Sequence, residues 1–141
     1  MRTGKVDILA FIGGSKTADT LAKEHPSPHR LKLFLQLEGK NLGVITENAD
    51  IDVAVAQTVV GSTTYNGQRC TAIKLVFVHE RVVNAFLPKF ISAVSELKAG
   101  LPWEEGVKIT PLPEPGKPDY LREIIADALS QGASIVNAAK G

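Results

Sequence analysis

The chain lacks cysteine pairs, long apolar runs and an excess of either charge. A single cysteine, Cys70, excludes an internal disulfide and a zinc site built from several cysteines. The longest apolar runs, at residues 8–12 and 75–78, are far too short to span a bilayer. Lys and Arg number 16 against 15 Asp and Glu, so the charge balance does not favour general binding to nucleic acid or to a membrane surface.

The rest of the composition is that of an ordinary folded domain. Hydrophobic residues make up 44% of the 141 residues and charged residues 22%, which is too few charges for a disordered tail. The first five residues are mildly basic, but Asp7 and the glycines at positions 13 and 14 interrupt any signal-like apolar segment. We therefore expect a soluble, cytoplasmic protein with the length of one domain.

Apolar runs alternate with helical patterns along the chain, which predicts an α/β fold with a mainly parallel sheet and crossover helices. The expected strands are residues 6–12, 31–37, 42–46, 72–78 and 134–137. The expected helices are residues 15–24, 48–63, 81–98 and 118–131. The strand at 72–78 carries few charges and is expected to be central. The proline-rich segment 101–117 is expected to be a surface loop without a strand.

Cys70 lies in a polar loop, residues 65–71, and two interpretations are open. The thiolate is the reactive form of cysteine, and the nearby cations Arg69 and Lys74 favour it, whereas the C-terminal end of the preceding helix disfavours it. The alternative is a buried, inert cysteine that packs as a small hydrophobe.

The three histidines do not complete a site with this cysteine. His25 and His29 lie in a proline-rich linker, and His79 closes a strand. This spacing does not indicate a Cys–His dyad, and these residues are too scattered for a convincing metal site. We expect no bound metal and place the histidines at linker or surface positions.

Two further segments carry groups with possible chemistry. Gly13, Gly14 and Ser15 join a strand to a helix, where backbone amides bind phosphate in some proteins and form a plain turn in others. Gln36 and Glu38 share one face of an extended strand. Glu38 is a candidate general base, and the alternative is a salt bridge between Glu38 and a cation such as Lys40.

Taken together, four ordered motifs resemble those of the aldehyde dehydrogenase superfamily. Residues 66–72 resemble its cysteine motif, and residues 10–14 its glycine turn under the cofactor. Residues 37–41 are similar to its E-L-G-G-K segment, and residues 48–52 to the helix start that follows. The resemblance covers about residues 6–137 and implies a partial aldehyde dehydrogenase-like fold.

Within the superfamily, residues 67–74 resemble the NADP-dependent, non-phosphorylating glyceraldehyde-3-phosphate dehydrogenase branch. The resemblance implies that Cys70 attacks the aldehyde carbon, that its backbone N–H holds the oxyanion, and that Arg69 meets the substrate phosphate. It also implies NADP or NAD as cofactor at Gly13 and Gly14. A thioacyl intermediate would then be hydrolysed to the acid.

The sequence departs from the family pattern at the general base. The position of the family's catalytic glutamate is held by Gln36, which cannot accept a proton at neutral pH, and Glu38 stands where a glycine belongs. Either Glu38 has taken over as base, or hydrolysis of the intermediate is impaired. The following glycine and lysine of the motif are retained as Gly39 and Lys40.

The resemblance also implies a fragment. Residues 1–38 correspond to the C-terminal end of a cofactor-binding domain, and residues 39–141 to the N-terminal half of a catalytic domain. The larger protein is expected to be a homo-oligomer, and the isolated chain to have little or no turnover. Two alternatives are a non-catalytic binding or assembly module and an aldehyde dehydrogenase for another substrate.

Overall fold

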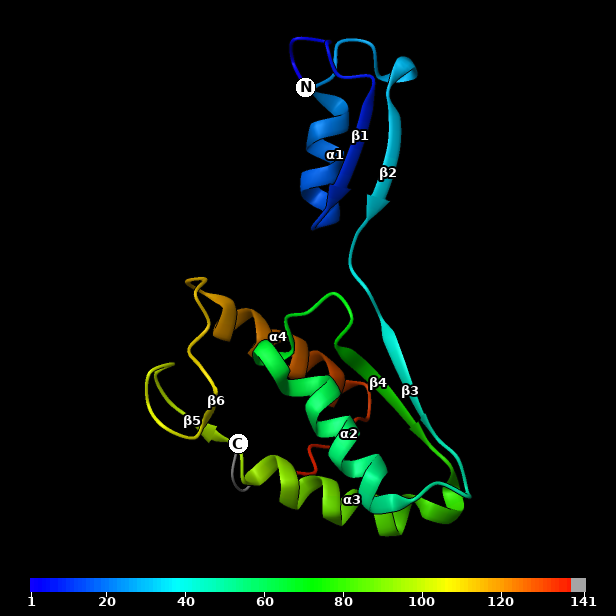
Figure 1. Cartoon of the computed structure of the whole chain (residues 1–141), viewed down its shortest axis with the longest axis vertical. Helices are drawn as coiled ribbons and strands as arrows, with labels where there is room; N and C mark the ends of the chain where they lie inside the picture. The colour runs from blue at the N-terminus through cyan, green and yellow to red at the C-terminus, as the bar shows by residue number, and fades with distance from the viewer. Residues whose placement is uncertain (138–141) are drawn as a thin grey trace. The chain divides into compact units, whose positions relative to one another are not determined.

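The computed structural model describes residues 1–137, and the chain forms two compact units, Met1–Lys40 and Asn41–Gly141 (Figure 1). Each unit contains parallel strands and helices, so the predicted α/β class is confirmed. Within residues 1–137 the strands pair in three two-stranded parallel sheets rather than in one sheet. None of the helices in residues 1–137 is long and apolar enough to cross a membrane.

The first unit is a strand–helix–strand element. β1 (Ile8–Ile12) pairs in parallel with β2 (Lys32–Gln36), with Ile8 opposite Lys32 and Ile12 opposite Gln36. α1 (Ser15–Lys23) is the crossover helix, and a short 3₁₀ helix, Pro28–Arg30, precedes β2. A parallel pair requires such a crossover, because the chain must return to the same end of the sheet.

His25 is buried in this unit, contrary to the surface or linker position expected for it. Its side chain is 4% exposed and makes two hydrogen bonds within the polypeptide. Ser27 N–H donates to Nδ1 at 3.0 Å, so the other ring nitrogen carries the proton and donates to the Val6 carbonyl at 2.9 Å. The ring therefore ties the segment after α1 to the residues before β1.

The second unit contains the main apolar core. β3 (Asn41–Ile45) pairs in parallel with β4 (Ile73–Val78), and α2 (Ile51–Thr63) lies between them in sequence. α3 (Glu80–Ser95) follows β4. The core is built on Ile45 of β3, Val55 of α2 and Phe86 of α3, and the Phe86 ring stacks on Phe90 at 5.5 Å.

The helix boundaries follow local sequence signals. The Asp50 carboxylate accepts hydrogen bonds from the backbone N–H groups of Asp52 and Val53, as an N-cap residue does. α3 begins one residue earlier than predicted and ends at Ser95, three residues before the predicted end, and it continues through Pro88. Core packing on both sides of this proline compensates for the backbone hydrogen bond that it cannot make.

The remaining elements correct three predictions. β5 (Lys98–Ala99) pairs with β6 (Val107–Ile109), so the proline-rich segment contains a strand. Three residues are too few to show a strand period. Residues 134–137 form no strand, and β4 pairs only with β3 within residues 1–137, so it is not central. A strand requires a neighbouring strand, and none of the described residues pairs with residues 134–137.

Several apolar surfaces are exposed in the described residues. One face of the β3–β4 sheet carries Leu42, Val44, Leu75 and Phe77, which are 51–63% exposed. The final helix, α4 (Lys117–Ser130), also exposes its large apolar residues, Leu121, Ile124, Ile125 and Leu129. Parallel sheets usually bury both faces, whereas the described residues place helices on only one face of this sheet.

Candidate functional site

The approach to Cys70 is a short left-handed turn at the end of a 3₁₀ helix, Thr64–Gly67, that follows α2. Tyr65, Asn66 and Gly67 have φ angles of 54°, 57° and 68°. This region favours glycine and tolerates asparagine better than most residues. A Cβ on Gly67 would lie 2.7 Å from the Ser62 carbonyl oxygen, so both sterics and φ require glycine there.

Asn66 anchors this turn to the segment that follows β6. Its Nδ2 donates to the Thr110 carbonyl at 3.0 Å and to Thr110 Oγ1 at 2.9 Å. Its Oδ1 accepts from Thr110 N–H at 2.9 Å. These three bonds join residues 44 positions apart and use both N–H donors and the oxygen of the side-chain amide. They hold the backbone in a conformation that would otherwise be unfavourable.

Two further side chains donate hydrogen bonds to backbone carbonyls at and around Cys70. Asn41 Nδ2, at the start of β3, donates to the carbonyls of Cys70 at 2.5 Å and Ala72 at 3.1 Å. Lys74 Nζ, on β4, donates to the carbonyls of Arg69 at 3.2 Å and Ala72 at 2.8 Å. The loop is therefore fixed at its entrance by Asn66 and at its exit by Asn41 and Lys74.

Cys70 itself is exposed in this chain, so it is not the buried cysteine of the alternative interpretation. Its backbone N–H donates no hydrogen bond to any protein atom within residues 1–137. A thiol and a free N–H on one residue of an anchored loop are the groups needed to attack a carbonyl carbon and to bind the resulting oxyanion.

Arg69 is also exposed, and its guanidinium carbon lies 4.3 Å from the centre of the Tyr65 ring. The flat face of the guanidinium stacks on the ring, and this contact restrains the Arg69 side chain. No carboxylate in residues 1–137 forms a salt bridge with it, so its N–H donors are available to an anionic ligand.

In the first unit, Glu38 contacts the N-terminus of α1 rather than Lys40. Glu38 Oε1 accepts hydrogen bonds from Ser15 N–H and from Ser15 Oγ, each at 2.9 Å. The Ser15 N–H is the main cause of a lowered Glu38 pKa; a backbone N–H of Glu38 and the Ser15 hydroxyl act in the same direction, and the Lys40 charge contributes least. A carboxylate with a lowered pKa is a weaker base.

The glycine turn lies beside this contact. Gly14 is the N-cap residue of α1 in an extended conformation, and Gly13 N–H donates to the Gln36 carbonyl at 3.1 Å. The N-terminus of α1 contacts an anion through Ser15, and this anion is the Glu38 carboxylate.

The structure thus gathers Gly13, Gly14, Gln36 and Glu38 in the first unit, and Arg69, Cys70 and Lys74 in the second. Sequence reasoning missed Asn41, the role of Asn66 as an anchor, and Thr110. Asn41 stands inside a segment that carries the family resemblance, which was the one available signal. Thr110 had none, because its partner lies 44 positions away.

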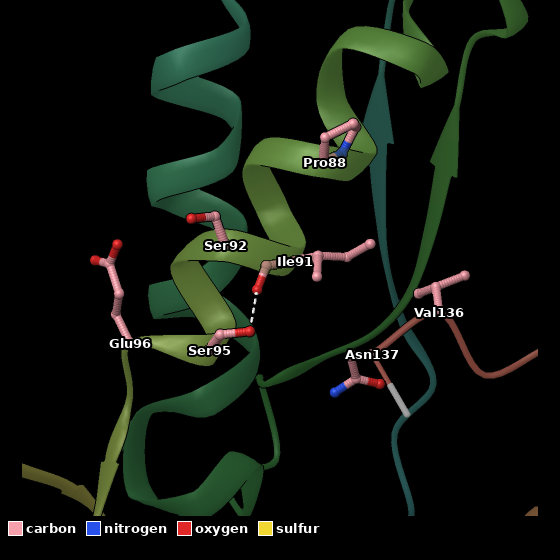
Figure 2. A pocket seen from close by; sticks show the side chains of 7 residues that line it. All are labelled: Pro88, Ile91, Ser92, Ser95, Glu96, Val136 and Asn137. Carbon is pink, nitrogen blue, oxygen red and sulfur yellow. Dashed lines mark hydrogen bonds between the residues drawn. The ribbon is translucent and has the colours of Figure 1, made fainter. Parts of the chain in front are cut away.

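Metal clusters and pockets elsewhere in the described residues were the other candidates for a site. No group of three or more His, Cys, Asp or Glu residues that could hold a metal occurs in the described residues. A pocket of about 420 Å³ lies against α3, lined by Pro88, Ile91, Ser92, Ser95, Glu96, Val136 and Asn137 (Figure 2). Its Ser95 Oγ donates to the Ile91 carbonyl at 2.8 Å, so this hydroxyl is occupied in the helix. The pocket shares no residue with the cysteine loop.

Comparison with known proteins shows which family the whole chain resembles. Residues 1–140 match the model of the aldehyde dehydrogenase family. NADP-dependent glyceraldehyde-3-phosphate dehydrogenase of Streptococcus equinus is 38% identical over 131 residues, 93% of this chain and 27% of the relative.

Two solved structures show the same similarity. The succinate-semialdehyde dehydrogenase of Burkholderia pseudomallei superposes with a TM-score of 0.84 at 35% identity, over 94% of this chain and 27% of that one. The NADP-dependent glyceraldehyde-3-phosphate dehydrogenase of Bacillus halodurans, complexed with NADP, superposes with a TM-score of 0.79 at 32% identity, over 92% and 26%. The chain therefore spans about a quarter of the length of these relatives.

Proposed function

Because the chain belongs to the aldehyde dehydrogenase family, we propose that it carries the nucleophile and the substrate-contacting loop of an enzyme that oxidises an aldehyde to the acid. The observation that carries this proposal is the exposed Cys70 on a loop anchored on both sides. The names of the similar proteins support the same reaction class.

In the proposed reaction, the Cys70 sulfur forms a bond to the aldehyde carbon, and the carbonyl oxygen becomes an oxyanion that accepts from the Cys70 N–H. NAD(P), when bound, would supply the acceptor for the hydride of this carbon. The carbon then remains on sulfur as a thioester, and water releases the acid and restores the thiol. Anchoring of the loop lowers the entropic cost of the attack, because the nucleophile and the N–H keep a fixed relation.

The residues of the first unit fit part of such a cofactor. Gly13 and Gly14 precede α1 without side chains, and a Cβ on Gly14 would meet only Glu38 Oε1, at 3.6 Å. Backbone amides at this helix start suit a phosphate. The Glu38 carboxylate, however, already bonds to Ser15, and it would repel a second anion there. The turn fits a cofactor phosphate when Glu38 withdraws from Ser15.

For release of the acid, Gln36 supplies no base, and Glu38 is a weak one while it bonds to Ser15. We therefore propose that hydrolysis of the thioester is slow and that Glu38 acts as base in that step. An accumulating thioester is the expected consequence.

For the substrate, we propose glyceraldehyde 3-phosphate, with Arg69 at the phosphate. An exposed guanidinium without a carboxylate partner binds phosphate through two parallel hydrogen bonds. A carboxylated aldehyde such as succinate semialdehyde is the second candidate, since a guanidinium binds a carboxylate in the same way. The Burkholderia relative is named for that substrate.

Protection of Cys70 from alkylation tests nucleophile and substrate together. The chain is treated with iodoacetamide in the presence of glyceraldehyde 3-phosphate, glyceraldehyde or succinate semialdehyde, and modified Cys70 is counted by mass spectrometry. We expect the phosphorylated aldehyde to protect at a concentration about tenfold lower than glyceraldehyde, because one charge-assisted pair is worth about 1.5 kcal/mol or more.

The matched variant is Arg69→Met, which removes the charge and the N–H donors and keeps an unbranched, although shorter, side chain. It should abolish the preference for the phosphate and leave protection by glyceraldehyde unchanged. Better protection by succinate semialdehyde would select the second substrate, and no protection by any aldehyde would contradict the proposed nucleophile.

A further inference from the structure

The ammonium group of Lys74 bonds to the backbone of the cysteine loop instead of to a carboxylate. Nζ donates to the Arg69 carbonyl at 3.2 Å and to the Ala72 carbonyl at 2.8 Å. Within residues 1–137, Lys74 forms no salt bridge. Its positive charge is therefore directed at the carbonyl groups that surround Cys70.

One of these carbonyls controls the direction of the Cys70 N–H. The Arg69 C=O and the Cys70 N–H belong to one peptide unit, and every peptide bond in residues 1–137 is trans. In a planar trans peptide these two groups point in opposite directions. Ala72 N–H also donates to the Arg69 oxygen, at 3.0 Å. Lys74 Nζ and Ala72 N–H thus hold the Arg69 carbonyl, and through the planar peptide they fix the direction of the Cys70 N–H.

The charge on Lys74 also affects the strength of this N–H as a donor. Hydrogen bonds from a charged group are stronger than those from a neutral group, and a bond to a carbonyl polarises the peptide to which it belongs. The polarised N–H has no protein acceptor within residues 1–137, and Cys70 is exposed. The N–H is thus oriented, polarised and open to an incoming oxygen.

We infer that Lys74 is a positioning residue, which acts through the Arg69–Cys70 peptide to align and polarise the Cys70 N–H as the oxyanion donor. This inference rests on the proposed function, because it needs Cys70 as the nucleophile. Lys74 touches neither the substrate nor the reacting atoms.

Two reactions of Cys70 separate this role from a general effect on the thiol. With p-nitrophenyl acetate, the sulfur attacks the ester carbonyl, an oxyanion forms, p-nitrophenolate leaves, and an acetyl group remains on sulfur. With iodoacetamide, the sulfur displaces iodide, and no oxyanion forms. Accessibility and thiolate fraction influence both rates, whereas the N–H donor influences only the first.

We expect Lys74→Met to lower the acylation rate about tenfold and to leave the alkylation rate within about twofold. Loss of an oxyanion donor itself costs about a hundredfold or more, and this substitution removes only its support. Lys74→Arg keeps the charge and the donors and should restore most of the acylation rate. The pH profile of alkylation, measured for each variant, corrects for any change in thiolate fraction.

The control variant is Lys108→Met on β6, which removes the same charge from the same unit but no bond to the loop carbonyls. Both of its rates should equal those of the original chain. If Lys74→Met does not fold, as judged by circular dichroism, the comparison uses Lys74→Gln against Lys74→Arg, and the neutral side chain should acylate more slowly.

Three results would overturn the inference. Two of them leave Cys70 as the proposed nucleophile, and the third excludes it as well. Unchanged acylation, or an equal fall in both rates, in the neutral Lys74 variants excludes the positioning role and leaves Cys70 as nucleophile. If the original chain alkylates but is acylated no faster than a cysteine-containing peptide, the proposed nucleophile fails together with the role of Lys74.

Discussion

Glu38 combines two roles that oppose each other. As an acceptor from Ser15 it satisfies a backbone N–H at the start of α1, where a negative charge is favourable. The same bonds lower its pKa, which reduces its strength as a base. Glu38, which stands where the family motif has glycine, thus stabilises the helix through its bonds to Ser15. The same bonds make it a weaker base for the proposed hydrolysis.

This coupling predicts the effect of Ser15→Ala. The substitution removes the hydroxyl donor and keeps the backbone donor, so the pKa of Glu38 should rise part of the way to its ordinary value. NMR titration of the side-chain carboxyl carbon measures it. Ser27→Ala, in the same unit and away from Glu38, should leave that pKa unchanged.

The sign of the pH dependence follows from the same contact. The folded pKa is below the unfolded one, so the contact stabilises the fold at pH values above the ordinary glutamate pKa. This stability is lost as the pH falls through the lowered folded value. An unchanged carboxyl titration in Ser15→Ala would show that the hydroxyl bond does not influence Glu38.

At the scale of elements, the left-handed turn before Cys70 depends on the bonds between Asn66 and Thr110. We expect Asn66→Ala to lower the free energy of unfolding by about 2 kcal/mol, because it removes three hydrogen bonds. Asn66→Gly loses the same bonds but relieves a left-handed residue of its Cβ, so it should be about 1 kcal/mol more stable than the alanine variant. Urea unfolding followed by circular dichroism measures both.

The two variants separate bonding from backbone strain. Equal stability of Asn66→Ala and Asn66→Gly would show that the left-handed conformation costs nothing at this residue. Stability equal to that of the original chain in both would show that the Thr110 contact does not hold the turn.

Sequence patterns predicted the elements whose signals are local. The expected helices at 48–63 and 81–98 correspond to α2 and α3, although α2 begins after Asp50, three residues later than expected. β6 escaped prediction because three residues carry no period, and residues 134–137 were wrongly assigned because an apolar run forms a strand only beside another strand.

The candidate site was predictable only in part, for the same reason. Cys70, Arg69 and Glu38 are visible as reactive residue types in recognisable motifs. The residues that hold them are not, since the bonds from Asn41 to Cys70 and from Ser15 to Glu38 span 29 and 23 positions. Such contacts depend on how the strands pair, which the local pattern does not encode.

At the scale of the whole molecule, one unit contains every group that anchors the cysteine loop. Asn41, Asn66, Lys74 and Thr110 all belong to Asn41–Gly141, together with Cys70. The same unit exposes an apolar sheet face, which is typical of a surface that associates with further polypeptide. The first chemical step proposed for Cys70, addition to a carbonyl, is therefore testable on this chain without any cofactor.

The most direct measurement is carbon-13 NMR of an aldehyde labelled at its carbonyl carbon and mixed with the chain. We predict a new signal from a tetrahedral carbon bonded to sulfur, present with the original chain and absent with Cys70→Ser. The absence of that signal at saturating aldehyde, or its persistence in Cys70→Ser, would contradict the central claim that Cys70 is the nucleophile.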